Sequence, residues 1–419
     1  MTIKANDPSR KSFVQVHADS DFPIQNLPFG VARIDGSEEV VSAIGDKIVR
    51  LKVLNDLGYF DGMDVPNEVL QNPYINDLMA KGKAWNRAFR DALSDILLEG
   101  SSAEKDADQF LIGQEEVTML LPVKVGDYTD FYSSREHATN VGTMFRDPDN
   151  ALLPNWLHLP VGYHGRASSI VVSGTNIHRP KGQQKPKDDE PPVFGPCKLL
   201  DFELEMAFVI GQSTPLGTSV STEEAEDYIF GLTLFNDWSA RDIQKWEYVP
   251  LGPFLAKNFA STVSPWIVPL DAFEPFRVEG PVQEPEVLPY LQQSGANNYD
   301  IQLSVHIEAE NGAHAVVCES NFKYMYWSMV QQLTHHTVNG CNIKVGDMCA
   351  SGTISGKDRS SFGSMLEISW RGTRPVPLSD GSERKFINDG DTVQMRGYAQ
   401  GQGYRIGFGP CDGKILPAT

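Results

Sequence analysis

The chain has 419 residues, 41% of them hydrophobic, which is enough for two or more domains with sizeable cores. Its 36 basic and 55 acidic residues give a net charge of −19, which argues against a nucleic-acid partner because phosphates require a basic surface. The 36 Gly and 27 Pro indicate many turns and therefore a β-rich fold.

Cysteine usage and hydropathy suggest the compartment. The 5 cysteines are odd in number and show no CxxC spacing, which disfavours a disulfide framework or a zinc site and favours a reducing environment. The N-terminal segment has no apolar core of a secretory signal, and no run approaches the roughly 20 apolar residues that span a bilayer. We therefore expect a cytoplasmic protein without a membrane partner.

The first part of the chain reads as a small β domain with one long helix. Strand-like segments occupy residues 22–53, and a helical pattern follows over residues 74–99. Four large apolar side chains recur on one face of that helix: Trp85, Phe89, Leu93 and Leu97. The polar, acidic residues beyond it read as a boundary, so we predict one domain over residues 1–118 and a second over residues 119–419.

The second domain reads as a large, mostly β body. Short strand-like segments alternate with Gly and Pro. The Pro/Lys-rich residues 178–196 are expected to form an exposed loop, and residues 274–298 also lack periodicity. One helix is predicted from Ser221, where Glu224 completes a capping box. A second is predicted from about Ser320, with four apolar side chains on one face: Phe322, Met325, Met329 and Leu333.

An acidic segment over residues 201–206 suggests a metal site. If this segment is a strand, Asp201, Glu203 and Glu205 share one face while the apolar residues between them pack behind it. Adjacent carboxylates repel each other, and a hard cation such as calcium or magnesium removes the repulsion by taking oxygen ligands. A solvated acidic face on an edge strand explains the same pattern.

Two further acids lie beside apolar, strand-like segments, namely Asp130 and Asp237. Spacing along the chain leaves open whether they join the other carboxylates. A helix beginning at Asp237 and ending at Pro250 would carry three more polar side chains on the same face: Arg241, Gln244 and Tyr248. Guanidinium and amide donors suit an anionic oxygen, although a solvent-exposed polar face fits the same spacing.

His137 is the candidate general base. It lies a few residues after Asp130, and an imidazole that titrates near neutral pH can take a proton from water; a structural histidine is the alternative. His335 and His336 cannot share one ion, because neighbours on a helix point about 100° apart, and His164 is assigned a structural role. No helical pattern follows the Gly-rich tail, which excludes a dinucleotide-binding loop there.

Together these segments resemble the fumarylacetoacetate hydrolase family, and its eukaryotic members in particular, over nearly the whole chain. The most specific strings are Asn-Asp-Trp-Ser-Ala-Arg-Asp at residues 236–242 and Leu-Pro-Val-Gly-Tyr-His-Gly-Arg-Ala-Ser-Ser at residues 159–169. The resemblance extends over six stretches: residues 127–142, 155–174, 200–208, 236–257, 320–341 and 351–367.

The resemblance implies a role for each candidate residue. A catalytic calcium ion would be held by four carboxylates: Asp130, Glu203, Glu205 and Asp237. His137 corresponds to the general base, with Glu367 beside it as its orienting partner. The developing oxyanion would be received by three side chains: Arg241, Gln244 and Lys257. Six positions correspond to substrate-binding residues: Tyr132, Arg146, Tyr163, Gln244, Tyr248 and Thr353.

The family also places a second ion, magnesium, beside Asp237, Lys257 and a hydroxyl four residues beyond that lysine. Here the hydroxyl belongs to Ser261, whereas the family carries threonine, so that the oxygen is kept and a methyl group is lost. Taken alone, Lys257 reads as a surface lysine.

The resemblance also implies fold and reaction. The expected fold is mostly β with some α: a small N-terminal Src-homology-3-like β-barrel joined to a large mixed β-sandwich or β-roll, assembled as a homodimer. The expected substrate is a dianionic diketo acid, 4-fumarylacetoacetate, split at a carbon–carbon bond into fumarate and acetoacetate in the last step of tyrosine and phenylalanine degradation. Water activated by His137 would attack the carbonyl, and the metal would stabilise the enolate leaving group.

Two other functions remain open. An acylpyruvate hydrolase or a 2-oxo-acid decarboxylase or isomerase of the same superfamily would share the carboxylates, but such proteins are usually shorter and have no comparable N-terminal domain. A non-catalytic, calcium-stabilised binding protein is the second alternative. The presence of His137, Glu367, Arg241 and Lys257 argues against it, because a decayed site tends to lose such groups.

Overall fold

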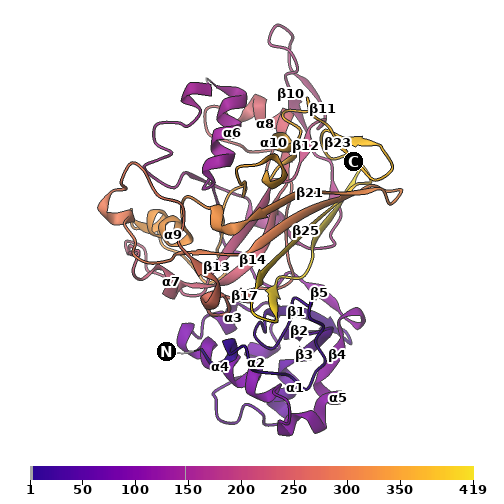
Figure 1. The fold of residues 1–419 in the computed structure, drawn as a ribbon, viewed down its shortest axis with the longest axis vertical. Coiled ribbons are helices and arrows are strands. Elements are labelled where there is room, and N and C mark those ends of the chain that lie inside the picture. Colours follow the sequence, from indigo (N-terminus) through magenta and orange to yellow (C-terminus); the bar gives the residue numbers. More distant parts are fainter. Residues whose placement is uncertain (1–2, 147) are drawn as a thin grey trace.

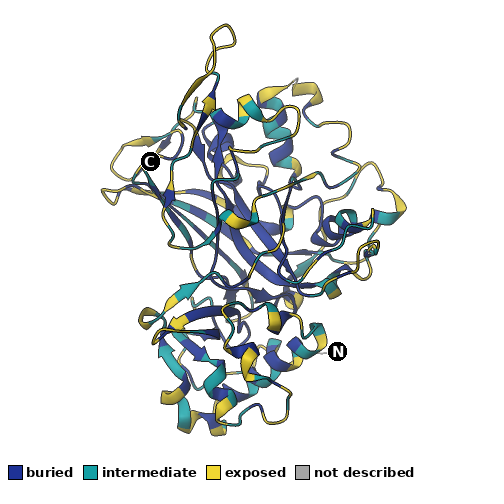
Figure 2. Cartoon of the chain, turned by 180° about the vertical axis from the view of Figure 1, so that it is seen from behind, coloured by how far each residue is buried: buried dark blue, intermediate teal, exposed yellow. Residues whose placement is uncertain are grey.

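The computed structural model describes residues 3–146 and 148–419 (Figure 1). A small N-terminal domain lies at one end of the molecule, and a larger body built from several sheets occupies the rest. The expected class, mostly β with some helix, is confirmed. Buried residues follow the strands of both parts, whereas the connecting loops are largely exposed (Figure 2). None of the helices in the described part of the chain is both long and apolar enough to cross a bilayer.

The N-terminal domain is built on a curled antiparallel sheet. Its five strands run in the order β4-β3-β2-β1-β5: β1 Phe29–Ile34, β2 Ser37–Ile44, β3 Lys47–Arg50, β4 Leu111–Gly113 and β5 Thr118–Leu120. The edge strands β4 and β5 are joined only by a 3-10 turn, Gln114–Glu116, and Val117. A flat sheet of this width measures about 19 Å, whereas the five steps from Gly113 to Thr118 reach at most about 18 Å when fully extended and less in a 3-10 turn, so the sheet must curl toward closure.

Five helices cover this sheet and share its core: α1 Leu51–Asp56, α2 Asn67–Leu70, α3 Asn76–Met79, α4 Lys83–Ile96 and α5 Ala107–Phe110. The single helix predicted over residues 74–99 is therefore wrong in extent, because Gly82 separates α3 from α4 with φ at +89°. The predicted apolar face of α4 holds, since Phe89, Leu93 and Leu97 are fully buried and Trp85 packs beside them.

Two sheets form the core of the C-terminal body. The eight-stranded sheet has the order β7-β6-β22-β13-β14-β16-β8, with β17 beside β14: β6 Tyr128–Phe131, β7 Gly162–His164, β8 Ile170–Val172, β13 Leu204–Ile210, β14 Ile229–Asp237, β16 Ser261–Val263, β17 Val268–Pro269 and β22 Met348–Ala350. The six-stranded sheet has the order β21-β20-β25-β27-β9, with β26 beside β25: β9 Ile177–His178, β20 Gln302–Glu308, β21 His314–Asn321, β25 Thr392–Gln400, β26 Arg405–Gly407 and β27 Cys411–Leu416.

The eight-stranded sheet is covered on both faces. Along β13, Leu204, Met206 and Phe208 belong to the core shared with the six-stranded sheet, whereas Ala207 and Val209 belong to the core shared with the N-terminal domain. This is the alternation that a strand imposes. The two domains are also joined by main-chain hydrogen bonds between Phe29 and Ile267 and by a bidentate ion pair of Arg87 with Asp271 at 2.6 Å.

Shorter elements surround these sheets. The helices are α6 Arg135–Phe145, α7 Ala225–Tyr228, α8 Arg241–Glu247, α9 Met329–Thr337 and α10 Met365–Ile368. Four two-stranded sheets complete the body: β10 Lys181–Gln184 with β11 Val193–Pro196, β12 Leu200–Asp201 with β15 Ser239–Ala240, β18 Arg277–Val278 with β19 Asn298–Tyr299, and β23 Val376–Pro377 with β24 Glu383–Arg384.

Three predictions about local structure need correction. The segment over residues 178–196 is largely exposed as expected, but it is not a plain loop, because β10 and β11 form a hairpin that projects from the body in Figure 1. The helix expected from Ser320 begins at Met329, where Ser328 and Gln331 form the capping box, and Ser320 itself lies in β21. The helix expected from Ser221 is the short α7, although Glu224 does accept the Ser221 N–H at 3.2 Å.

Candidate metal centre and its surroundings

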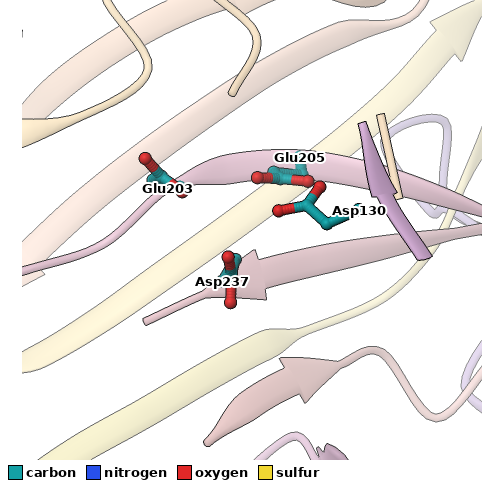
Figure 3. Close-up of side chains that lie close together, drawn as sticks. All are labelled: Asp130, Glu203, Glu205 and Asp237. Atoms are coloured by element: carbon teal, nitrogen blue, oxygen red, sulfur yellow. The ribbon is translucent and has the colours of Figure 1, made fainter. Parts of the chain in front are cut away.

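Four buried carboxylates converge in the C-terminal body: Asp130, Glu203, Glu205 and Asp237. Each offers an oxygen, and these oxygens all lie within 4.8 Å of one another. In Figure 3 the carboxyl groups point toward a common centre, with Asp237 at the end of its strand. The metal-ligand prediction stays a prediction, but the solvated-face alternative fails because all four side chains are buried.

Strand register explains why these acids meet. Asp130 shares a face of β6 with Tyr128, Glu205 shares a face of β13 with Ala207, and Asp237 shares a face of β14 with Phe235. Tyr128, Ala207 and Phe235 all belong to the core shared with the N-terminal domain, so the three acids lie on that same face of the sheet. Glu203 joins them from just before β13, where its carbonyl accepts the Asp237 N–H at 3.3 Å.

The acidic segment is not one continuous strand as predicted. It breaks between β12 and β13, and Asn236 Oδ1 accepts the Glu203 N–H at 3.2 Å inside the break. Asp201 is thereby turned away from the other acids. Its carboxylate accepts hydrogen bonds from Arg241 Nε at 2.9 Å and from the main-chain N–H groups of Met365 and Leu366 at 2.7 and 3.0 Å.

Positive charge reaches only part of the carboxylate cluster. Lys257 Nζ donates to both Glu203 Oε2 and Asp237 Oδ2, and Arg241 Nη2 lies 2.8 Å from Glu203 Oε1 without hydrogen-bond geometry. Burial raises the pKa of Glu203, but attraction by Arg241 and then Lys257 outweighs burial and leaves that pKa below its ordinary value. Lys257 is therefore a buried residue of the site rather than a surface lysine.

The other two carboxylates of the cluster, Asp130 and Glu205, each have an oxygen without a hydrogen-bond partner among the described residues. Asp130 Oδ1 and Glu205 Oε1 are buried with no hydrogen-bond partner among the described residues. Burial, and then repulsion from neighbouring carboxylates, holds the pKa of Asp130 and the pKa of Glu205 well above their ordinary values. A buried, all-oxygen, anionic donor set with orphaned lone pairs fits a hard divalent cation. The cluster is therefore compatible with a divalent metal site.

His137 lies at the edge of this cluster. Its Nδ1 is 2.7 Å from Glu367 Oε2, and its Nε2 is 4.0 Å from Glu203 Oε1. Burial raises the pKa of Glu367, but attraction by His137 and hydrogen bonds from His137, Asn140 and Ser364 outweigh burial, so the pKa of Glu367 lies below its ordinary value. Nδ1 faces Glu367, and Nε2 is the ring nitrogen that faces the carboxylate cluster.

The helix predicted to begin at Asp237 begins instead at Arg241. Asp237 is the last residue of β14, whose nine residues are all buried. Trp238 and the two residues of β15 separate it from α8. Arg241 still reaches the cluster, and its Nη1 donates to Gln244 Oε1 at 3.2 Å. Tyr248, by contrast, lies just beyond α8 and is 53% exposed, and among the described residues no hydrogen bond joins it to the carboxylates.

Of the remaining substrate-binding candidates, three lie beside the carboxylate cluster or His137 and one lies away from them. Tyr163 OH donates to Asp237 Oδ2 at 3.0 Å, and Tyr132 packs edge-on against His137 with ring centroids 5.2 Å apart. Thr353 is buried beside Gly352, whose N–H donates to Glu205 Oε2 at 2.9 Å. Arg146 is exposed and donates to the Ala151 carbonyl at 2.7 Å, so it does not contact the carboxylates.

Ser261 lies beside the cluster on the neighbouring strand. It pairs with Asp237 across β14 and β16, and its hydroxyl donates to Asp237 Oδ1 at 3.3 Å. Sequence reasoning missed three other polar residues that contact Glu367: Asn140, Ser355 and Ser364. The Ser364-x-x-Glu367 spacing at the start of α10, typical of a helix cap, was the one local signal that could have revealed part of this group. His336 and His335 contact Thr129 and Tyr290 at 3.0 Å and do not join the carboxylates.

The chain is similar to known proteins over most of its length. A family model described as Fumarylacetoacetate (FAA) hydrolase C-terminal matches residues 127–415, and one described as Fumarylacetoacetase N-terminal matches residues 25–122. Fumarylacetoacetase of Homo sapiens is 55% identical over 97% of this chain and 99% of its own length. Fumarylacetoacetase of Dictyostelium discoideum is 54% identical over 97% of this chain and 98% of its own length.

A solved structure is also similar. Fumarylacetoacetate hydrolase from the psychrophile Exiguobacterium antarcticum aligns over 93% of this chain and 99% of its own, with a TM-score of 0.53 and 17% identity. At that identity the similarity shows a shared fold alone.

Proposed function

The chain belongs to the fumarylacetoacetate hydrolase family, and from this premise we propose that it hydrolyses fumarylacetoacetate to fumarate and acetoacetate. This reaction belongs to tyrosine and phenylalanine catabolism. One observation carries the reaction type. The imidazole of His137 is held by Glu367 on one side and presents its other nitrogen to a cluster of four buried carboxylates. A poised base beside a site suited to a divalent cation is what metal-assisted hydrolysis requires.

We propose that the site binds two metal ions, Ca²⁺ and Mg²⁺. Asp130, Glu203, Glu205 and Asp237 would hold Ca²⁺, and Asp237, Lys257 and Ser261 would neighbour Mg²⁺. A bound divalent cation supplies Lewis-acid stabilisation for the negative charge that develops on the diketo oxygens. The orphaned oxygens of Asp130 and Glu205 support this assignment, because a cation of matching hardness would satisfy both.

His137 would act as the general base. Its Nε2 takes a proton from water, and the hydroxide attacks the carbonyl carbon next to the fumaryl group. The carbon–carbon bond then breaks, its electron pair leaves with the acetoacetate fragment, and a proton returned to that fragment completes the products. Water thus contributes its hydroxyl to fumarate and its hydrogen to acetoacetate. Glu367 remains ionised throughout and orients the imidazole.

Arg241, Gln244 and Lys257 would stabilise the oxyanion of the tetrahedral intermediate. One such donor is worth roughly 3 kcal/mol in a buried site. Arg241 and Lys257 are both buried beside Glu203, so they keep positive charge where a dianionic substrate must bind in a protein of net charge −19. Five further positions are proposed to contact the substrate: Tyr132, Arg146, Tyr163, Tyr248 and Thr353. Arg146 would have to release the Ala151 carbonyl to do so.

We further propose a homodimer in the cytoplasm. Large apolar side chains are exposed after α8, with Val249, Leu251 and Phe254 at 66%, 96% and 67% exposure. Apolar surface of this kind is typical of an interface. Light scattering of the purified protein should give twice the mass of the chain, 46.4 kDa.

The decisive experiment is the loss of ultraviolet absorbance when purified protein meets fumarylacetoacetate, with and without a chelator. Loss that requires metal and yields equimolar fumarate and acetoacetate supports the proposal. Turnover of an acylpyruvate instead would assign the chain to a sister activity. Turnover of neither compound would favour a non-catalytic, calcium-stabilised protein.

A further inference from the structure

The carboxylate of Glu367 is surrounded by more donors than the base-orienting role alone requires. Its Oε2 accepts hydrogen bonds from His137 Nδ1 at 2.7 Å and Ser364 Oγ at 2.8 Å. Its Oε1 accepts from Asn140 Nδ2 at 2.9 Å. Ser355 Oγ lies 3.0 Å from both oxygens. Glu367 is fully buried, so water does not compete for these positions.

The hydrogen bonds around the two serines define the direction of donation. Ser355 Oγ accepts the main-chain N–H of Gly363 at 3.0 Å, and Ser364 Oγ accepts the main-chain N–H of Glu367 at 3.4 Å. Each hydroxyl therefore accepts one main-chain N–H and has its single hydrogen available for the carboxylate. Every neighbour of Glu367 named here is a donor, and the carboxylate acts only as an acceptor.

His137 and Asn140 lie three residues apart on α6, on the same face of that helix. His137 donates to Glu367 Oε2 and Asn140 donates to Glu367 Oε1. Helix α6 therefore hydrogen-bonds both oxygens of a carboxylate that α10 carries. The terminal torsion of a glutamate side chain is broad and intrinsically poorly defined. The plane of the Glu367 carboxylate must therefore be set by its hydrogen bonds rather than by its own rotamer.

We propose that Asn140, with Ser355 and Ser364, is a positioning residue that fixes the plane of the Glu367 carboxylate and thereby the orientation of His137. This inference rests on the proposed function of His137 as the base. Without the Asn140 donor, the carboxylate can turn about its last torsion, and the imidazole turns with it. Nε2 then no longer faces the carboxylate cluster in the geometry that takes a proton from water.

Two substitutions test this role without changing the size of the side chain. Asn140→Leu removes the donor, and Asn140→Asp replaces it by an acceptor that repels Glu367. Partners of an orienting group typically contribute about 10- to 100-fold, so we expect kcat to fall by about that factor in Asn140→Leu and further in Asn140→Asp. KM and calorimetric Ca²⁺ affinity should stay within about twofold, because the donor contacts neither substrate nor carboxylate cluster. Thr139→Ala, the neighbouring residue on α6, is the matched control and should retain wild-type kcat.

A second readout does not depend on turnover. The Nδ1 proton of His137, bonded to a carboxylate, should give a downfield ¹H resonance, assigned by its disappearance in His137→Gln. We expect this resonance to shift or broaden in both Asn140 variants and in Ser355→Ala, and to stay unchanged in Thr139→Ala. Wild-type kcat with an unchanged resonance in Asn140→Leu would overturn the proposal, and so would a loss of kcat that merely parallels a loss of Ca²⁺ affinity. If the wild-type protein hydrolyses no fumarylacetoacetate, the proposed function fails, while the resonance still decides whether Asn140 positions His137.

Discussion

Arg241 and Asp201 form a buried ion pair, with Arg241 Nε 2.9 Å from Asp201 Oδ2. The same carboxylate accepts two main-chain N–H groups at the start of α10, those of Met365 and Leu366. Asp201 therefore ties α8, which carries Arg241, to α10, which carries Glu367. One buried acid outside the carboxylate cluster thus connects the proposed oxyanion site to the partner of the proposed base.

Replacing Asp201 by Ala should destabilise the fold by about 3–5 kcal/mol, because Arg241 would lose one of its two buried acidic partners and two main-chain N–H groups of α10 would lose their acceptor. Urea unfolding in the presence of a chelator measures this without a contribution from bound metal. Asp389→Ala is the control, since it removes an ion pair with Arg179 whose acid is 42% exposed, and exposed pairs are worth at most about 1 kcal/mol. Equal effects of the two substitutions would contradict the structural role of Asp201.

His137→Gln should abolish turnover and leave Ca²⁺ affinity nearly unchanged, because His137 contacts Glu367 directly but lies 4.0 Å from the nearest carboxylate of the cluster. Product formation and calorimetry on the same preparation measure the two effects. His306→Gln, on β20 of the six-stranded sheet, serves as the control. Near-normal hydrolysis by His137→Gln would remove His137 from the role of general base.

Asp237→Ala should lose both metal and activity. The substitution removes one of four converging carboxylates and also a partner of Lys257, Tyr163 and Ser261. Calorimetric titration with Ca²⁺ should show a fall of at least about tenfold in affinity. Asp188→Ala, in the exposed turn between β10 and β11, makes the same change in net charge and should bind Ca²⁺ as the wild type does. Unchanged affinity in Asp237→Ala would exclude Asp237 as a ligand.

The metal-free protein should become less stable as the pH rises above about 4, the ordinary carboxyl pKa. Burial and carboxylate repulsion raise the pKa of Asp130 and of Glu205 above the value of about 4 that such groups have in an unfolded chain. The folded state then holds protons that the unfolded state has released, and this stabilisation is lost as the pH passes through the folded pKa.

Thermal unfolding at a series of pH values measures this dependence. Excess Ca²⁺ should weaken it, since the cation takes the place of the protons and adds about 2.7 kcal/mol of stability at a hundredfold excess over Kd. Asp130→Asn should have a shallower slope than the wild type, higher stability without metal at pH 8, and little response to Ca²⁺. Identical slopes in the wild type and in Asp130→Asn would argue against repulsion within the cluster.

Local patterns predicted some elements well and others poorly. The apolar face of α4 could be read directly, because a helix of several turns repeats its spacing often enough to exclude chance. The segment around Asp237 misled, because helical spacing of Asp237, Arg241 and Gln244 also arises when a buried strand ends and a short helix follows. The helix predicted from about Ser320 begins at Met329 instead, because its N-terminal cap is Ser328. Ser320 belongs to the preceding strand, β21.

The candidate site shows the same division. Residue types and the family resemblance are enough to predict the four acids, His137, Glu367, Arg241 and Lys257 as site residues. They did not separate Asp201 from the other acids of its segment, because the break before β13 depends on which strands each half pairs with. Nor did they reveal that Asn140, Ser355 and Ser364 surround Glu367, since hydrogen bonds between distant segments have no periodicity along the chain.

The sequence by itself determined the β-rich class, the family and the chemical character of the site, because composition, strand alternation and long matching strings are properties of the chain order. Only the tertiary structure decided which carboxylates meet, which one is diverted to Arg241, and which oxygens remain without partners. Those outcomes depend on pairing between β6, β22, β13, β14 and β16, whose residues are far apart in sequence. A strand dictates which face a side chain occupies, but only its neighbours in the sheet dictate what that side chain contacts.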